Sequence, residues 1–159
     1  MPVFLFTYHA YGTWLPDRPE GYLRRREGLQ PSSREEATRY RRRMIQSPVV
    51  FDEAIQKRII EAVKNTEQYI DVTTRMVATD PTHAHVLLQW SHRRGPKSLR
   101  QSVKTAISIA LKKQEDKQWL SGGATGKQVK DEEHLHHLEW LYLPGHRGWK
   151  WVRGKGLFK

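Results

Sequence analysis

Two histidines separated by one residue stand at the head of an apolar run, in the segment PTHAHVLLQW from Pro81 to Trp90. Successive side chains of a β-strand alternate between its two faces, so His83 and His85 would point the same way, roughly 7 Å apart at the backbone. Imidazole nitrogens at that spacing can converge on one metal ion, with a third ligand supplied from elsewhere in the fold. The alternative is that both rings are solvated on the open face of a sheet.

The charge of the chain favours a polyanionic partner. Its 159 residues carry 28 Lys and Arg against 17 Asp and Glu, a formal net charge of +11 with a sequence pI near 10.1. A field of that sign attracts nucleic acid, although ribosome-like surfaces and anionic membranes would attract it too. With no cysteine, the chain can form neither a disulfide nor a thiolate metal site.

Nothing in the sequence suggests a membrane segment. No apolar run approaches the roughly 20 residues that span a bilayer. The start, MPVFLFTYHAYGTW, lacks the basic region and small-residue cleavage site of a signal peptide. We therefore expect no membrane partner and a cytoplasmic location.

The pattern of apolar residues and capping signals predicts one α+β domain over residues 1–159, with a basic, aromatic tail over 147–159. In chain order we expect a strand over 3–8, a helix from Ser32 or Ser33 to Ile45, a helix capped by Asp52, hairpin strands over 71–79 and 82–90, a helix from Pro96, a fourth strand within 120–129, and a last helix from Asp131 towards Tyr142. This order predicts a ferredoxin-like antiparallel sheet with helices packed on one face.

Two of these elements have a clear buried side. In the strand after Pro81, the residues that alternate with the histidines (Ala84, Val86, Leu88 and Trp90) should enter the core. In the helix from Pro96, the apolar stripe consists of Leu99, Val103, Ala106, Ile107, Ala110 and Leu111. The histidines are therefore expected on the face of their strand that points away from this core.

The segment THAHVLLQW resembles the HUH motif (histidine, hydrophobic residue, histidine) of single-strand DNA transposases that use one catalytic tyrosine. FTYHAYGTWLPD resembles the first strand and loop of the branch related to the REP-associated tyrosine transposases. WLSGG, from Trp119, and DEEHLHHLEWLYL, from Asp131, resemble the segment leading into their tyrosine helix. The matching stretches lie in the same order over most of the chain.

The resemblance implies a ferredoxin-like core that binds Mg²⁺ or Mn²⁺ through His83, His85 and a third polar ligand. It implies that a tyrosine attacks a phosphate of single-stranded or hairpin DNA, leaving a 5′-phosphotyrosine and a free 3′-OH that allow rejoining without ATP. A homodimer is a further expected partner, because swapped helices are common in the wider family, whereas the REP-associated branch can be monomeric.

Tyr142 is the candidate nucleophile among six tyrosines, because it follows His85 by 57 residues, about the separation that the family shows. His146 falls where the family carries its third metal ligand. Residues four apart share a helix face, but Pro144 and Gly145 intervene. Alternatives stay open: Tyr142 could be a core residue on the stripe of Leu135 and Leu138, or Trp140 or Leu141 could occupy the tyrosine's place in an inactive relative.

Other residues offer weaker candidates. His134 and His137, three apart on the last helix, are a competing metal pair without an acidic or cysteine partner nearby. The arginine-rich helix before Ile45 either touches phosphate or is a solvated surface, and the tail either stacks on unpaired bases or covers the core. The expected DNA contacts are Arg24, Arg25, Arg26, Arg41, Arg42, Arg43, Arg93, Arg94, Lys97, Arg100, Lys104, Trp149, Lys150, Trp151 and Arg153.

The favoured hypothesis is a metal-dependent endonuclease and transposase that cleaves and rejoins single strands near hairpins. The alternative is a catalytically silenced DNA- or RNA-binding protein on the same core. The two differ in whether a tyrosine hydroxyl lies within reach of the paired histidines. A two-histidine RNA phosphoesterase would need a second HxT or HxS motif, and none of the eight histidines begins one.

Overall fold

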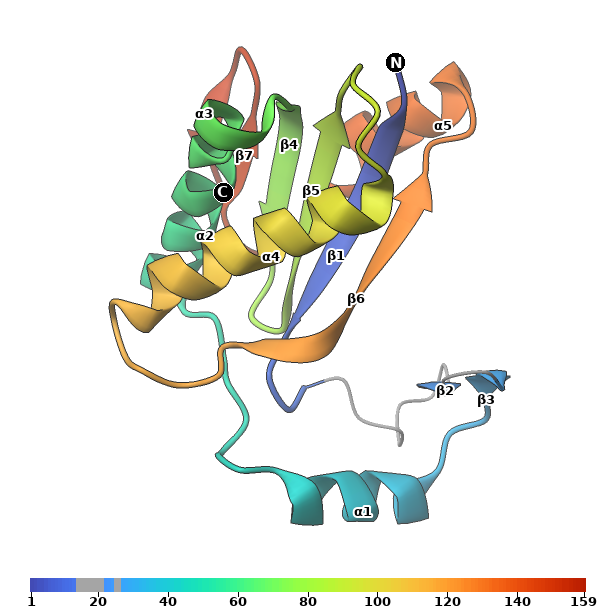
Figure 1. Ribbon diagram of the computed structural model, residues 1–159, viewed down its shortest axis with the longest axis vertical. Helices are drawn as coiled ribbons and strands as arrows, with labels where there is room; N and C mark the ends of the chain where they lie inside the picture. The colour runs from blue at the N-terminus through green and yellow to red at the C-terminus, as the bar shows by residue number, and fades with distance from the viewer. Residues whose placement is uncertain (14–21, 25–26) are drawn as a thin grey trace.

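The structure, a computed structural model, describes residues 1–13, 22–24 and 27–159, with the backbone alone described for 22–24 (Figure 1). Trp14, Arg25 and Arg26 and the side chain of Arg24 therefore lie outside the described residues. The strands are β1 (Val3–Ala10), β2 (Tyr22–Arg24), β3 (Gly28–Gln30), β4 (Thr73–Thr79), β5 (His83–Gln89), β6 (Leu120–Gln128), β7 (Lys150–Val152) and β8 (Gly156–Phe158). The helices are α1 (Arg34–Arg43), α2 (Glu53–Asn65), α3 (Glu67–Ile70), α4 (Pro96–Lys112), α5 (Glu132–His137) and the π-helix η1 (Leu138–Tyr142).

Six strands form one sheet in the order β6-β1-β5-β4-β7-β8, and every neighbouring pair is antiparallel. Four neighbouring strands of this sheet, β6, β1, β5 and β4, are joined through α2 and α4 and have the order and connections of a ferredoxin-like core. The predicted α+β class and antiparallel sheet are confirmed. Within the described residues, no helix is long and apolar enough to cross a membrane.

The main core lies between the sheet and the helices α2 and α4, which cover the front face in Figure 1. Phe6 and Tyr8 of β1, Val86 of β5 and Ile107 of α4 are fully or almost fully buried there. Asp52 accepts a hydrogen bond from the Ile55 amide and so begins α2 at the residue that the sequence predicted. The apolar spacing of both helices places them on this face, and the Asp52 cap sets where α2 begins.

A second, smaller core lies on the opposite face, where Leu5, Met76 and Leu87 of the sheet meet Leu138 and Leu143 of the C-terminal helical segment. The sequence predicted helices on one face. The structure confirms this face for α2 and α4 and adds α5 and η1 behind the sheet (Figure 1). This second layer matters because it covers the side of β5 that carries the histidines.

The helix α1 stands apart from both layers, beyond the end of the sheet (Figure 1). Ser33 caps it, as predicted, by accepting a hydrogen bond from the Glu36 amide. It ends at Arg43 rather than Ile45, because Met44 already has extended backbone angles. Ala37 is its buried residue, so α1 is a mostly solvated helix with an arginine-rich surface.

The hydrophobic contacts of α4 predict unequal effects of two isoleucines on stability. Ile107 is fully buried, whereas Ile109 on the same helix is 57% exposed. Ile107→Ala should lower the free energy of unfolding by about 2–5 kcal/mol, because it leaves a cavity in the main core. Ile109→Ala should change it by less than about 0.5 kcal/mol. Urea unfolding of both variants measures the difference, and equal losses would contradict this packing.

Candidate active site

His83 and His85 lie on β5 in the middle of the sheet, each opposite a residue of β1. The register pairs His83 with His9 and His85 with Thr7. The alternating residues Ala84, Val86 and Leu88 are buried in the main core, as expected. Both imidazoles therefore point to the other face, towards η1 and the residues that follow it.

His146 completes a cluster of three imidazoles. Its ring centroid lies 4.6 Å from that of His85 and 5.3 Å from that of His83, and the latter two are 4.8 Å apart. One nitrogen from each ring lies within 4.8 Å of the others, an arrangement that can hold a metal ion. The structure thus brings together the three histidines that the sequence singled out.

Hydrogen bonds at the Nδ1 atoms orient these rings. The Nδ1 of His146 lies 3.2 Å from the carbonyl oxygens of Tyr142 and Leu143, which only accept, so this nitrogen carries the proton. The Nδ1 of His85 lies 2.8 Å from the hydroxyl of Thr7, and that of His83 lies 3.0 Å from the hydroxyl of Thr82. With the proton on Nδ1, each ring offers the lone pair of Nε2, which is the usual arrangement behind a metal-ligating histidine.

His85 is the most buried of the three, at 5% exposed. Burial, followed by the charges of His83, His146 and His9, lowers the pKa of His85 to about 3. Its ring is therefore neutral near neutral pH, since the low-dielectric surroundings disfavour the imidazolium form. A neutral ring is the form that can bind a metal ion without first losing a proton.

Tyr142 lies at the end of η1, with its hydroxyl oxygen 3.4 Å from Nε2 of His85. Its ring also contacts that of His146, at a centroid distance of 5.1 Å. At 43% exposed, Tyr142 is not a core residue, and it faces the cluster, whereas Trp140 and Leu141 are 68% and 66% exposed. Of the three residues considered for this place, Tyr142 is the one that the structure puts against the histidines.

The π-helix explains how the tyrosine and histidine meet although Pro144 and Gly145 separate them. Its wider turns shift Tyr142 relative to an ordinary α-helix, and such segments are frequent at functional sites. The helix then ends, and the His146 amide donates to the Leu143 carbonyl 3.2 Å away. His146 reaches Tyr142 by this turn, not by the continuous helix face that the spacing of four suggested.

Three contacts hold this returning segment against the sheet. The Nε of Arg75 on β4 donates to Glu139 on η1 across 2.7 Å, in a partly buried ion pair. Leu138 and Leu143 are buried in the second core. Gly148 passes so close to β4 that a Cβ there would come within 2.4 Å of the Thr79 carbonyl oxygen. The position of His146 is therefore fixed from both sides.

Donor geometry and chemistry both fit a metal ion here. Nitrogens bound tetrahedrally to one ion at about 2.1 Å lie about 3.4 Å apart, so ligand nitrogens within 4.8 Å of one another would have to move closer by up to about 1.4 Å. Rotation of half-buried side chains can supply that. Three protein ligands also leave coordination positions for a substrate, as in catalytic metal sites.

The competing histidines do not form such a group. His134 accepts a hydrogen bond from the Lys130 amide at its Nδ1, and His136 stacks on Trp140. His137 is exposed on α5. Among the residues that the structure describes, the cluster of His83, His85 and His146 is the group of three with metal-ligand spacing.

The expected DNA contacts divide by position. Among the described residues, seven of them are exposed: Arg41, Arg42, Arg43, Arg93, Arg94, Lys97 and Arg153. Arg100 and Lys104 of α4 are half-buried, and Lys104 Nζ donates to the Gly122 carbonyl 3.0 Å away. Arg153 forms an ion pair with Glu67. Arg41, Arg42 and Arg43 of α1 and Arg93 and Arg94 of the loop before α4 therefore lie on the surface of the molecule.

Three of the expected DNA contacts in the tail, Trp149, Lys150 and Trp151, are buried or half-buried. Lys150, expected to contact DNA, is 4% exposed, and its Nζ donates to the carbonyl oxygens of His146 and Gly148 at 2.7 and 3.0 Å. Lys150 is therefore not proposed as a DNA contact, because its buried ammonium group binds these two carbonyls and fixes the turn that presents His146. Trp149 and Trp151 are half-buried against the main core, as in the alternative reading of the tail as a cover.

Two residues near the cluster had no predicted role. Thr7 orients His85, and His9, which is 7% exposed, places its ring 6.1 Å from that of His83. Both lie in FTYHAYG, where the sequence showed only a resemblance to the first strand of the transposase family. Their signal in the sequence is the alternation of Thr7 and His9 opposite buried Phe6 and Tyr8, which becomes informative only once the β1–β5 register is known.

No family model and no curated protein matches this sequence. A solved structure of a REP-associated tyrosine transposase bound to a REP hairpin is similar to the chain, with 13% sequence identity and a TM-score of 0.49. The similarity covers 90% of this chain and 66% of that one. The chain thus spans just under two thirds of the length of that protein, and a likeness of this extent assigns neither a ligand nor a reaction.

The geometry predicts that Mn²⁺ binding depends on the three clustered histidines. His146→Ala removes one of three ligands and should weaken Mn²⁺ binding at least about 10-fold, and Thr7→Val, which frees the ring of His85, by about 10-fold. His137→Ala is the matched control on α5 and should bind like the wild type. Free Mn²⁺ is measured by electron paramagnetic resonance; equal affinities in all four proteins would contradict the site.

Proposed function

We propose that this chain is a HUH-type, single-tyrosine nuclease that cleaves and rejoins single-stranded DNA. The observation that carries the proposal is the 3.4 Å approach of the Tyr142 hydroxyl to Nε2 of His85, within a cluster of three histidines. A tyrosine beside three imidazoles with metal-ligand spacing combines a nucleophile with an electrophilic centre. The motif order in the sequence and the charge of +11 support the same assignment.

In the proposed reaction, the Tyr142 oxygen attacks the scissile phosphorus as the bond to the 3′-oxygen breaks. The hydroxyl gives up its proton to solvent, the departing 3′-oxygen takes one up, and the 5′-phosphate stays on the tyrosine. A metal ion held by His83, His85 and His146 would stabilise the negative charge on the phosphoryl oxygens. Attack by a 3′-OH on the phosphotyrosine reverses the step and conserves the bond energy.

The hydrogen bond between Tyr142 and His85 bears on how the tyrosine would become free to react. The tyrosine hydroxyl and a metal ion compete for the same Nε2 lone pair. Metal binding would therefore release the hydroxyl from His85 and leave it beside the cation. The burial of His85 and the hydrogen bond that its Nδ1 donates to the Thr7 hydroxyl keep its ring in place during this exchange.

Of the two expected ions, the donor set favours Mn²⁺. Three neutral imidazoles and no carboxylate suit a borderline metal, whereas Mg²⁺ prefers oxygen ligands. Single-stranded or hairpin DNA is the proposed substrate, with the exposed arginines of α1 and Arg93 and Arg94 meeting its phosphates. A single catalytic domain over residues 1–159 remains part of the proposal, as does its operation as a monomer or a homodimer.

The test is covalent capture of DNA. Incubated with Mn²⁺ and single-stranded hairpin DNA from the regions flanking its own gene, the protein should give a protein–DNA band on a denaturing gel. Tyr142→Phe should abolish the band while leaving DNA affinity unchanged, because it removes only the nucleophilic oxygen. Tyr69→Phe is the control, since Tyr69 lies on α3 and is 81% exposed.

The outcomes separate the two function classes. A band in wild type and Tyr69→Phe that is missing in Tyr142→Phe supports the nuclease. A band that survives in Tyr142→Phe contradicts the assignment of the nucleophile. Tight binding without any band in the wild type overturns the catalytic proposal in favour of the silenced, nucleic-acid-binding alternative.

A further inference from the structure

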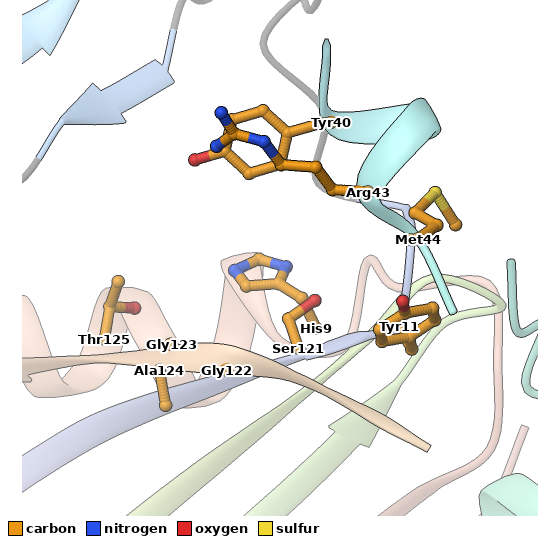
Figure 2. Close-up of a pocket in the computed structure, with 11 residues that line it drawn as sticks. His9, Tyr11, Tyr40, Arg43, Met44, Ser121, Gly122, Gly123, Ala124 and Thr125 are labelled. Atoms are coloured by element: carbon orange, nitrogen blue, oxygen red, sulfur yellow. The ribbon is translucent and has the colours of Figure 1, made fainter. Parts of the chain in front are cut away.

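A cavity of about 580 Å³ lies between α1 and the sheet edge formed by β1 and β6. Figure 2 shows Tyr40 and Arg43 projecting from α1 over a floor that includes His9 and Ser121. Met44 and Tyr11 close the end of the cavity nearest to the turn after β1. Its volume falls in the range of sites for small ligands, roughly 300–1,000 Å³.

The cavity adjoins the histidine cluster through His9. This residue lines the cavity and also pairs with His83 across the β1–β5 register, with 6.1 Å between the two ring centroids. On β6, Thr125 pairs with Thr7, the residue that orients His85. The floor of the cavity and the metal ligands thus lie on the same face of the sheet, side by side.

The walls combine flat rings with positive charge. Tyr40 is 49% exposed and its ring faces the open cavity, while Arg43 contributes a planar guanidinium group (Figure 2). None of the described residues lining the cavity is acidic. Aromatic and guanidinium planes that stand next to a basic surface are the groups on which unpaired bases stack.

The floor is left open by glycine. β6 shifts register between Tyr8 and Ala10 of β1, so that extra residues of β6 lie opposite His9. Gly123 lies between Ser121 and Thr125, whose side chains point into the cavity in Figure 2. A Cβ added at Gly123 would meet no atom within 4 Å, which means that it would occupy the cavity without a clash.

The wall that α1 provides is anchored to the sheet, although α1 itself lies outside the two cores. The Tyr11 hydroxyl accepts a hydrogen bond from the Ile45 amide at 3.0 Å. Gln46 and Gln118 exchange two hydrogen bonds, at 2.7 and 3.0 Å. These bonds fix the end of α1 that carries Arg43, so the cavity is a built feature of the fold.

We propose that this cavity binds one unpaired nucleobase of the DNA strand next to the scissile phosphate, stacked on Tyr40. The inference rests on the proposed nuclease function, because the adjacent histidines place the phosphate. A base held there positions the strand so that its phosphate lies at the histidine cluster. Arg43 meets the backbone of the same nucleotide.

The test uses equilibrium binding, which does not require cleavage. The probes are hairpin oligonucleotides from the regions flanking the gene, with a single-stranded extension that carries 2-aminopurine at one position at a time. Stacking quenches this fluorescent base. In the wild type, one position of the extension should be quenched more than its neighbours, and an abasic site at that position should weaken binding about 10-fold, the effect of losing one stacked base.

Two variants and one control locate the effect. Tyr40→Ala should remove the quenching at that position and weaken binding about 10-fold. Gly123→Val should do the same by filling the cavity, with an unchanged midpoint of thermal unfolding. Tyr69→Ala, a tyrosine 81% exposed on α3, should behave like the wild type.

Covalent capture of the same oligonucleotides distinguishes failure of this inference from failure of the nuclease proposal. Position-specific quenching that depends on Tyr40 and Gly123, without a covalent band, would retain the base site and overturn the nuclease. A covalent band with equal quenching and affinity in all four proteins would overturn the base site alone. No binding of any oligonucleotide overturns both.

Discussion

The antiparallel pairing of β1 with β5 is the constraint on which the site depends. It sets His85 opposite Thr7 and His83 opposite His9, so that four polar side chains share one face while Phe6, Tyr8, Ala84 and Val86 are buried on the other. A slip of one residue would exchange the faces and bury the imidazoles in the main core. Burial of the apolar side chains therefore fixes the register of the two strands, and the same register fixes the positions of the histidines.

The site also requires that the C-terminal segment, which carries Tyr142 and His146, return to the polar face of β1 and β5. The ion pair of Arg75 with Glu139 and the burial of Leu138 and Leu143 hold η1 against the sheet. Lys150 then donates to the His146 and Gly148 carbonyls, which stabilises the turn after Pro144. The buried ammonium group has its pKa lowered, mainly by desolvation, and its hydrogen bonds compensate for that cost. Tyr142 and His146 thus owe their positions to contacts made by their neighbours.

Local signals in the sequence predicted much of this. Ser33, Asp52 and Asp131 each cap the helix that their residue type indicated, and the alternation in HAHVLLQW set the face of both histidines. What could not be predicted depends on packing between distant segments. The second layer packs against β1, β4 and β5, the ion pair of Glu139 joins residues 64 apart in the sequence, and Lys150 is paired with Ala78 of β4. Likewise, the role of His9 requires the strand register, and the cavity beside it requires the anchoring of α1.

The most direct measurement of the central claim is a crystal structure of the protein soaked with Mn²⁺, with anomalous diffraction data collected at the manganese absorption edge. The account predicts one strong anomalous peak within about 2.3 Å of one nitrogen each from His83, His85 and His146, with the Tyr142 hydroxyl moved off His85 and beside the ion. A peak at His134 and His137, or a soaked crystal in which the Tyr142 hydroxyl still bonds to His85 with no ion at the cluster, would contradict it.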